Sequence, residues 1–302
     1  MLKNTLNIFS DIKKMVQKTT KDEPLSKYTS FCIGGAADVF VEVTTIEELR
    51  SILKYADSRN ISILALGRGT NILVSDKGFR GIVLQLGEAF RGVDFKKDCA
   101  EAGSAAELPV LASKSFARGL SGLEFAVGIP GSVGGAVASN AGAYGKSMKD
   151  VVSELSIVDL QGKLHRVLKS DIMFSYRKAV FPFDGIITKV KVKLIPRDKN
   201  DIIGDVQLCI EKRKRTQGVS FPNAGCVFKN TDSCNSGKLI EDAGLKGLRV
   251  GGAQVSVKHA NYIVNIGGAT AEDVLCLIEQ VRTKVMETSG VKLELEIKLV
   301  GE

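Results

Sequence analysis

The chain has 302 residues, of which 44% are hydrophobic and 25% are charged, with 31 glycines and only 6 prolines. This composition excludes a disordered or fibrous protein, and the length exceeds what one hydrophobic core usually organises. The formal net charge of +8 favours anionic partners, which include nucleotides, phosphorylated metabolites, nucleic acid and membrane lipid, and it does not choose among them.

The cysteines and histidines argue against a metal site. Six cysteines are scattered without a C-x-x-C pair, and the two histidines, His165 and His259, are far apart in the sequence. We therefore predict no bound metal. The first residues lack the apolar core of a signal peptide, and no run approaches the ~20 apolar residues of a membrane span. We expect a cytoplasmic protein with reduced thiols and no membrane partner.

The N-terminal elements predict a helix followed by a small unit of strands and a helix. Residues 1–20 carry apolar side chains at helical spacing. Residues 38–43 have the pattern of a strand, and Thr45 with Glu48 forms a capping box ahead of the next helix. Further strands are expected at 61–66, 72–74 and 82–86.

The rest of the chain predicts two more units. Residues 155–167 have the pattern of a hairpin, and Lys189, Lys191 and Lys193 alternate with apolar residues as in a half-exposed strand. A polar linker at 196–200 then precedes the last unit. The elements expected there are a helix to residue 215, strands at 253–257 and 262–266, a helix from residue 270, and a closing strand with an apolar face of Leu293, Leu295, Ile297 and Leu299. The class is α+β.

Two glycine-rich segments follow strands. In Gly67-Arg68-Gly69-Thr70-Asn71, backbone amides could converge on a phosphate, although a tight turn is an equal alternative. The second segment, residues 128–145, has a glycine density that lets the backbone approach a ligand closely. Together they favour one extended diphosphate ligand, with tight packing as the alternative for the second segment.

Three further segments offer reactive groups. Arg177 has forked donors suited to a carboxylate or an enolate, with a surface ion pair as the alternative. Glu296 lies on the polar side of the closing strand, where simple solvent exposure is the default. Cys226 lies on a turn and is a candidate proton donor. The basic run at residues 212–215 ends a helix, which favours an interaction with the helix dipole over phosphate binding.

In this order, the segments resemble the UDP-N-acetylenolpyruvoylglucosamine reductase family over nearly the whole chain. The motifs that carry the resemblance are residues 28–35, 67–74, 122–124 with 128–145, 174–177, 223–230, 239–247, 252–256 with 259–261, and 294–297.

The resemblance implies a three-domain α+β flavoprotein. Two subdomains of the vanillyl-alcohol-oxidase (PCMH) type would bind FAD, and a C-terminal α+β domain would bind the substrate. The expected boundaries are 1–24 for a helical arm, 25–86 and 87–196 for the two FAD-binding subdomains, and 201–302 for the substrate-binding domain. The short spacing between Tyr176 and the linker resembles the shorter branch of the family, type II.

The resemblance also implies the reaction. NADPH reduces FAD, and flavin N5 then gives a hydride to UDP-N-acetylglucosamine enolpyruvate, which makes UDP-N-acetylmuramate for peptidoglycan, and so for cell-wall biogenesis, cell shape and cell division. Arg177 and Glu296 would stabilise the enolate, and Cys226 would protonate it. The implied protein is a cytoplasmic monomer with no nucleic-acid partner.

The expected ligand contacts follow the matched motifs. The FAD-binding residues would be Gly67, Arg68, Gly69, Thr70, Asn71, Ile72, Gly128, Pro130, Gly131, Gly134, Gly135, Ala136, Asn140, Gly142, Ala143 and Tyr144. The substrate-binding residues would be Tyr176, Arg177, Lys229, Asn230, Gln254 and His259. The chain departs from the family's usual pattern at Arg68 (usually Gly), Ala179 (usually Ser), Cys226 (often Ser) and Thr231 (usually Pro).

Two other functions are compatible with parts of the pattern. An FAD oxidase of the same cofactor fold would use oxygen as the electron acceptor and would ignore the enolpyruvyl sugar. A non-enzymatic nucleotide-binding module would bind RNA through residues 212–215, and its binding would weaken steeply with salt.

Overall fold

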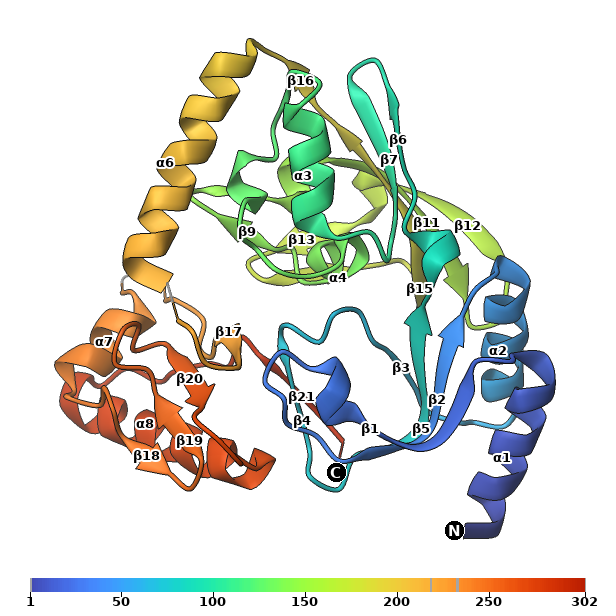
Figure 1. Cartoon of the computed structure of the whole chain (residues 1–302), viewed down its shortest axis with the longest axis horizontal. Helices are drawn as coiled ribbons and strands as arrows, with labels where there is room; N and C mark the ends of the chain where they lie inside the picture. Colours follow the sequence, from blue (N-terminus) through green and yellow to red (C-terminus); the bar gives the residue numbers. More distant parts are fainter. Residues whose placement is uncertain (1, 218, 232–233, 302) are drawn as a thin grey trace. The chain divides into compact units, whose positions relative to one another are not determined.

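The computed structural model describes residues 2–217, 219–231 and 234–301, which form two compact units (Figure 1). The first unit comprises Met1–Lys21, Val39–Arg68 and Gly81–Arg213, and the second comprises Asp22–Asp38, Gly69–Arg80 and Lys214–Glu302. The units are therefore interleaved in the sequence, whereas the expected segments 1–24, 25–86, 87–196 and 201–302 are contiguous. Those segments stay a proposal about domain organisation.

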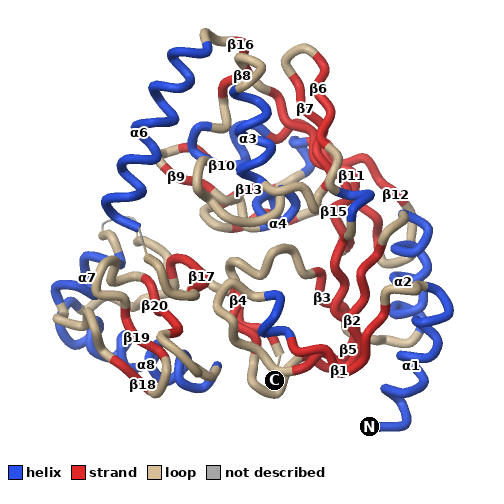
Figure 2. The backbone as a smooth tube through the Cα atoms, viewed as in Figure 1, coloured by secondary structure: helices blue, strands red, loops and turns tan. Residues whose placement is uncertain are grey.

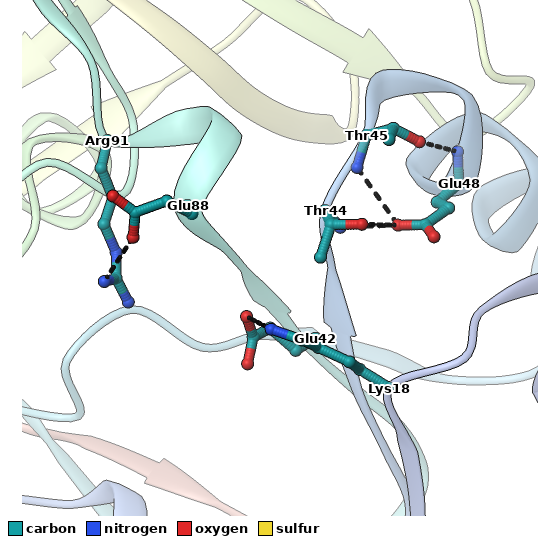
Figure 3. Close-up of polar contacts among 7 residues, drawn as sticks. All are labelled: Lys18, Glu42, Thr44, Thr45, Glu48, Glu88 and Arg91. Carbon is teal, nitrogen blue, oxygen red and sulfur yellow. Dashed lines mark hydrogen bonds and ion pairs between the residues drawn. The ribbon is translucent and has the colours of Figure 1, made fainter.

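The first sheet has the strand order β1-β2-β5-β3. Its strands are β1 (Thr19–Pro24), β2 (Ala36–Val43), β5 (Phe79–Leu86) and β3 (Ile63–Ala65). Helices α1 (Leu2–Met15) and α2 (Ile46–Ser58) bury their apolar residues in one core with β2 and β5. The capping box predicted at Thr45 and Glu48 is confirmed (Figure 3).

The expected helix over residues 1–20 is too long. The helix ends at Met15, and residues 19–24 form a strand, because their backbone pairs with β2 as the edge of the sheet. Ile12 of this helix and Val16, just after its end, are buried in one core with α2.

A second, five-stranded antiparallel sheet has the order β12-β11-β15-β7-β6. Its strands are β6 (Val93–Lys96), β7 (Cys99–Gly103), β11 (Val152–Asp159), β12 (Leu164–Leu168) and β15 (Gly185–Lys193). The predicted hairpin is confirmed as β11 and β12. In β15, Val190 and Val192 are fully buried while Lys189 and Lys193 are exposed, so the predicted alternation is also confirmed.

The helices and short elements around this sheet complete the first unit (Figure 2). The helices are α3 (Leu108–Phe116), α4 (Val133–Ala138), α5 (Met148–Val151) and α6 (Lys199–Gln217). The short strands are β8 (Leu120–Ser121), β9 (Gly142–Ala143), β10 (Lys146–Ser147), β13 (Met173–Ser175), β14 (Lys178–Val180) and β16 (Ile195–Pro196). Single 3-10 turns are η2 (Glu88–Phe90), η3 (Glu124–Ala126) and η4 (Lys169–Asp171), with η1 (Leu25–Tyr28) in the second unit.

The second unit contains a four-stranded sheet of order β17-β20-β19-β18 and a two-stranded parallel pair, β4 with β21. The strands are β17 (Asn223–Cys226), β18 (Arg249–Val250), β19 (Ala253–Val255), β20 (Tyr262–Asn265), β4 (Ile72–Val74) and β21 (Lys298–Val300), and the helices are α7 (Ser236–Asp242) and α8 (Ala271–Ser289). Apolar residues of α8 and the sheet share a core with Phe31 and Leu73.

The closing strand is shorter than the sequence predicts. Only Lys298–Val300 is a strand, and Leu295 makes an isolated bridge to Phe228. Leu293 and Ile297 are buried as expected, but Leu299 is 51% exposed. The alternation fails at Leu299 because β21 pairs with β4, so the two halves of the segment have different partners.

A carboxylate from residues 69–80 caps α8. The side chain of Asp76 accepts the N–H groups of Ala271 (2.8 Å) and Glu272 (3.0 Å). Thr270 and Asp273 add a capping box at the same helix end. The first turn of α8 is therefore stabilised by a group distant in the sequence.

Among the residues that the structure describes, none of the helices combines the length and the apolar character that a membrane span needs.

Candidate active site

The first unit contains a cavity of about 220 Å³ between its two sheets and α4. Two of its walls are glycine-rich and belong to the predicted segments: Gly67 and Arg68 on one side, Gly134 and Gly135 on the other. The remaining lining residues are Ala65, Leu66, Leu84, Gln85, Leu86, Arg91, Ser104, Ala105, Glu107, Ser132, Ala138, Phe181, Gly185, Ile186 and Ile187. The lining thus combines apolar side chains with hydroxyl groups and two arginines.

Close packing explains why the cavity walls are glycine. A Cβ atom at Gly67 would lie 2.7 Å from the Ser132 hydroxyl, and one at Gly134 would overlap the Ser104 hydroxyl. Gly135, at the first turn of α4, donates its N–H to Ser132 (3.2 Å). Without Cβ atoms, the backbone and the two hydroxyl groups stay close to the cavity.

Both arginines of the cavity wall are held by carboxylates. Arg68 Nη1 lies 2.7 Å from Glu107 Oε1, so this pair connects the loop after β3 to the residue that precedes α3. Arg91 Nη1 lies 2.9 Å from Glu88 Oε2 (Figure 3). The Arg68–Glu107 pair is therefore part of the cavity wall, although both side chains remain about half exposed.

Arg177 lies in the hairpin between β13 and β14. Its backbone has φ 56°, a left-handed conformation that is unusual outside glycine, and its Nη1 donates to the carbonyl of Gly142 (2.8 Å). Asn140 donates to the carbonyl of Ser175 (2.9 Å), one residue before Tyr176. The second glycine-rich segment thus fixes the hairpin that carries Arg177. Non-glycine residues in this backbone region are enriched at functional sites.

Other predicted FAD-binding residues of this segment lie outside the cavity lining. A Cβ at Gly128 would lie 2.8 Å from Cδ of Arg213, so this glycine permits close packing of α6. Tyr144 is 45% exposed and donates to the carbonyl of Cys209 on α6 (3.0 Å). The others outside the lining are Pro130, Gly131, Ala136, Asn140, Gly142 and Ala143. Close packing against α6, which was the alternative explanation for this segment, therefore accounts for Gly128.

The unit boundary divides the first glycine-rich segment after Arg68, and Gly69 to Ile72 belong to the second unit. Gly69 has φ 60°, and a Cβ there would overlap the carbonyl of Tyr28. The side chain of Asn71 donates to the backbone carbonyl of Glu296 (3.3 Å).

Within the second unit, the structure brings Cys226 and Glu296 onto neighbouring backbone segments. Cys226 is the last residue of β17 and is half-buried. The next residue, Val227, accepts the N–H of Glu296 at its carbonyl (2.8 Å). Glu296 is half-buried, which argues against simple solvent exposure, the alternative to a functional role for this side chain. Two segments distant in the sequence, one carrying the thiol and the other the carboxylate, are thereby joined by a backbone hydrogen bond.

The predicted substrate-binding residues of this unit have defined partners. Lys229 Nζ lies 3.3 Å from Glu294 Oε2, and Asn230 Oδ1 accepts the N–H of Ser236 (3.1 Å). Gln254 Nε2 donates to the carbonyl of Gly247 (3.1 Å).

His259 has a defined tautomer. Its Nδ1 accepts the N–H of Asn261 (3.3 Å), which leaves the proton on Nε2. Burial lowers the pKa of His259 below its ordinary value, so the ring is a neutral hydrogen-bond donor at neutral pH.

Sequence reasoning missed several of the residues now in view. Ser104 and Gln85 follow ordinary strand patterns, and nothing in their surroundings indicates a cavity. Ser132 could have been found from the sequence, because a serine directly before the first residue of a helix is a typical N-cap. Among the described residues, no group of three or more His, Cys, Asp or Glu side chains could hold a metal.

Comparison with known proteins identifies the family. Residues 217–300 match the C-terminal domain of UDP-N-acetylenolpyruvoylglucosamine reductase, and residues 37–168 match an FAD binding domain. The reductase 2 of Symbiobacterium thermophilum is 44% identical over 92% of this chain and 91% of its own length, and that of Lachnoclostridium phytofermentans is 40% identical over 98% and 97%. The chain belongs to the UDP-N-acetylenolpyruvoylglucosamine reductase family.

A solved structure agrees with this assignment. The reductase from Thermus caldophilus has a TM-score of 0.82 and 36% identity, covering 93% of this chain and 98% of its own. The expected α+β class, with an FAD-binding unit and a C-terminal domain, is confirmed. So is the enzyme class, an FAD oxidoreductase of peptidoglycan precursor synthesis.

The cavity fits part of FAD. At about 220 Å³ it is smaller than the roughly 300–1,000 Å³ typical of ligand pockets, so it can hold only a portion of a dinucleotide. Its apolar wall suits a flat ring, and its glycine backbone, hydroxyl groups and arginines suit a neighbouring phosphate.

Proposed function

We propose that this chain reduces UDP-N-acetylglucosamine enolpyruvate to UDP-N-acetylmuramate with electrons from NADPH, and that Arg177, Cys226 and Glu296 are its catalytic residues. FAD, when bound, supplies the hydride that reduces the enolpyruvyl methylene carbon. The observation that supports the residue assignment is the backbone hydrogen bond between Val227 and Glu296, because it places the segment that carries the Cys226 thiol beside the segment that carries the Glu296 carboxylate.

The proposed roles follow from charge and proton balance. Addition of a hydride to the methylene carbon leaves an enolate beside the substrate carboxylate. Arg177 and Glu296 stabilise that negative charge, the first as a fixed cation and the second as a protonated carboxyl group that donates a hydrogen bond to the enolate oxygen. The S–H bond of Cys226 breaks, and its proton goes to the alpha carbon. The resulting thiolate regains a proton from solvent.

Binding roles are proposed along the same lines. Gly67, Arg68, Gly134 and Gly135 hold FAD in the cavity, together with Ser104 and Ser132. The other predicted FAD-binding residues keep that assignment as a proposal. Tyr176, Arg177, Lys229, Asn230, Gln254 and His259 bind the substrate, with the Nε2–H of His259 as a donor.

Several finer properties belong to the same proposal. The chain is a member of the shorter branch of the family, works as a cytoplasmic monomer, and has no nucleic-acid partner. The net positive charge of the chain attracts its three anionic ligands, which are FAD, NADPH and the nucleotide sugar.

The test separates the two half-reactions. We would purify the protein with FAD, reduce it anaerobically with NADPH, and add UDP-N-acetylglucosamine enolpyruvate while following the flavin spectrum. Prompt reoxidation by the sugar supports the proposal. A flavin that stays reduced until air enters favours the oxidase, and a protein that takes up no flavin even on reconstitution favours the binding module.

Substitution at Cys226 tests the proton donor. Cys226→Ala should leave reduction by NADPH unchanged and slow the step with the sugar by about 10²–10⁴-fold, the usual contribution of a general acid. Cys226→Ser is the matched control, because a hydroxyl keeps a proton at the same position. Normal turnover by Cys226→Ala would refute the role of the thiol.

A further inference from the structure

A buried amide side chain, Asn261, is bonded to the backbone that follows Cys226. Its Oδ1 accepts the N–H of Phe228 (2.9 Å), and its Nδ2 donates to the carbonyl of the same residue (2.8 Å). Its own backbone carbonyl accepts the N–H of Val227 (2.8 Å). Asn261 is only 2% exposed, so water does not compete for these bonds.

The position of Asn261 in the sheet explains why a side chain is needed there. The pairing of β17 with β20 ends at the pair Cys226 and Tyr262. Beyond this pair, the side-chain amide of Asn261 offers one donor and one acceptor, as a peptide group does. The backbone carbonyl of Asn261 bonds Val227 and its side-chain amide bonds Phe228, so Asn261 continues the hydrogen bonding of the sheet for two residues after the strands have ended.

The opposite edge of the same backbone is bonded to the segment that carries Glu296. Val227 accepts the N–H of Glu296, and Lys229 donates its N–H to the carbonyl of Glu294 (both 2.8 Å). Residues 227–229 thus lie between Asn261 on one side and residues 294–296 on the other. The relative positions of the thiol and the carboxylate depend on this short segment, and Asn261 holds one side of it.

We propose that Asn261 is a positioning residue, which keeps the Cys226 thiol in place relative to Glu296 for proton delivery. The inference rests on the proposed function of these two residues. A proton donor must lie within hydrogen-bond reach of the carbon it protonates, and a displacement of about 1 Å can cost about 100-fold in rate. Loss of the amide frees Phe228, two residues from the thiol, to move.

The chain contains a matched control in Asn265, the last residue of β20, the strand that begins directly after Asn261. Asn265 is also buried (9% exposed), and its amide also bonds backbone: it donates to Phe31 (3.1 Å) and accepts from Gly267 (3.0 Å) and Ala269 (3.2 Å). Its side chain has no bond to residues 226–229 or 294–296 among these contacts. Substitution there therefore removes comparable buried hydrogen bonds without freeing the thiol.

The experiment compares Asn261→Asp with Asn265→Asp in the full-length flavoenzyme. Each change keeps the side-chain volume and an acceptor oxygen but removes the donor. For Asn261→Asp, we expect flavin reoxidation by the enolpyruvyl sugar to slow by about 10–100-fold, while reduction by NADPH stays within about twofold. Lowering the pH should restore part of the lost rate, because the protonated carboxyl can again donate to Phe228. Asn265→Asp should leave reoxidation within about threefold of the parent.

The outcomes are distinguishable. Equal reoxidation rates in the two aspartate variants would overturn the positioning role, whatever their thermal stabilities. If Asn261→Asp does not fold, the same comparison made with Asn261→Ser and Asn265→Ser decides the question. Cys226→Ala is measured alongside. Fast flavin reoxidation in that variant refutes the proposed role of the thiol itself. Slow reoxidation in Cys226→Ala together with fast reoxidation in Asn261→Asp refutes only the positioning inference.

Discussion

The cap that Asp76 provides to α8 makes a quantitative prediction for stability. Asp76→Ala removes an acceptor from two N–H groups, those of Ala271 and Glu272, and removes a negative charge from the positive end of the helix. Loss of an N-terminal capping side chain costs about 0.5–2 kcal/mol, and a charge at a helix end contributes about 0.3–1 kcal/mol. We therefore expect the free energy of unfolding to fall by about 2 kcal/mol.

Urea unfolding followed by far-ultraviolet circular dichroism measures this loss, since the chain has no tryptophan to report by fluorescence. Glu279→Ala is the control, because it removes an exposed carboxylate paired with Arg282 on the same helix and should cost less than about 0.5 kcal/mol. Asp76→Asn keeps an acceptor oxygen and should fall between the two. Hydrogen exchange should also become faster at Ala271 and Glu272. If Asp76→Ala is no less stable than Glu279→Ala, the cap does not stabilise the helix.

Three further predictions follow from other contacts. A non-glycine residue in the left-handed conformation costs roughly 1–2 kcal/mol. Gly69→Ala should lower the free energy of unfolding by more than this, because the new Cβ would also overlap the carbonyl of Tyr28. Gly92→Ala, where a Cβ meets no atom within 4 Å, should be neutral in the same unfolding assay. Burial lowers the pKa of His259, so the imidazole of the unfolded chain binds a proton at a higher pH than that of the folded chain. The free energy of unfolding should therefore decline as the pH falls below about 6.5. The substitution His259→Gln should make this decline smaller. Glu107→Ala should speed FAD release by no more than about fivefold, seen as flavin fluorescence, because its ion pair with Arg68 is exposed and contributes at most about 1 kcal/mol. Arg68→Ala should speed release more than Glu107→Ala does, because Arg68 is proposed to hold FAD directly, and equal effects would contradict that role.

The sequence predicted well the elements whose signals are local. The capping box of Thr45 and Glu48 needs only four consecutive residues and an apolar face behind them. The hairpin of β11 and β12 and the alternation in β15 likewise depend on patterns of period two. In each case the residues that form the element also contain the whole pattern.

Features that depend on distant partners were less predictable. Leu299 follows the alternation of the closing segment, yet it is exposed because β21 pairs with β4. The link between Val227 and Glu296, and the amide of Asn261 beside it, likewise join residues that no local pattern relates. The motifs of the resemblance named Cys226 and Glu296, but only the fold shows the backbone that joins them.

The parallel pairing of β4 with β21 has a consequence for biosynthesis. Because a ribosome makes the chain from its N-terminus, Ile72 to Val74 emerge long before Lys298 to Val300, the residues with which they pair. Asp76 must similarly wait for the first turn of α8. The first unit can complete its sheets while synthesis continues, whereas β4 of the second unit has no partner strand until β21 is made. A nascent chain therefore presents the unpaired backbone of β4 to chaperones and proteases until the last residues of the chain are made.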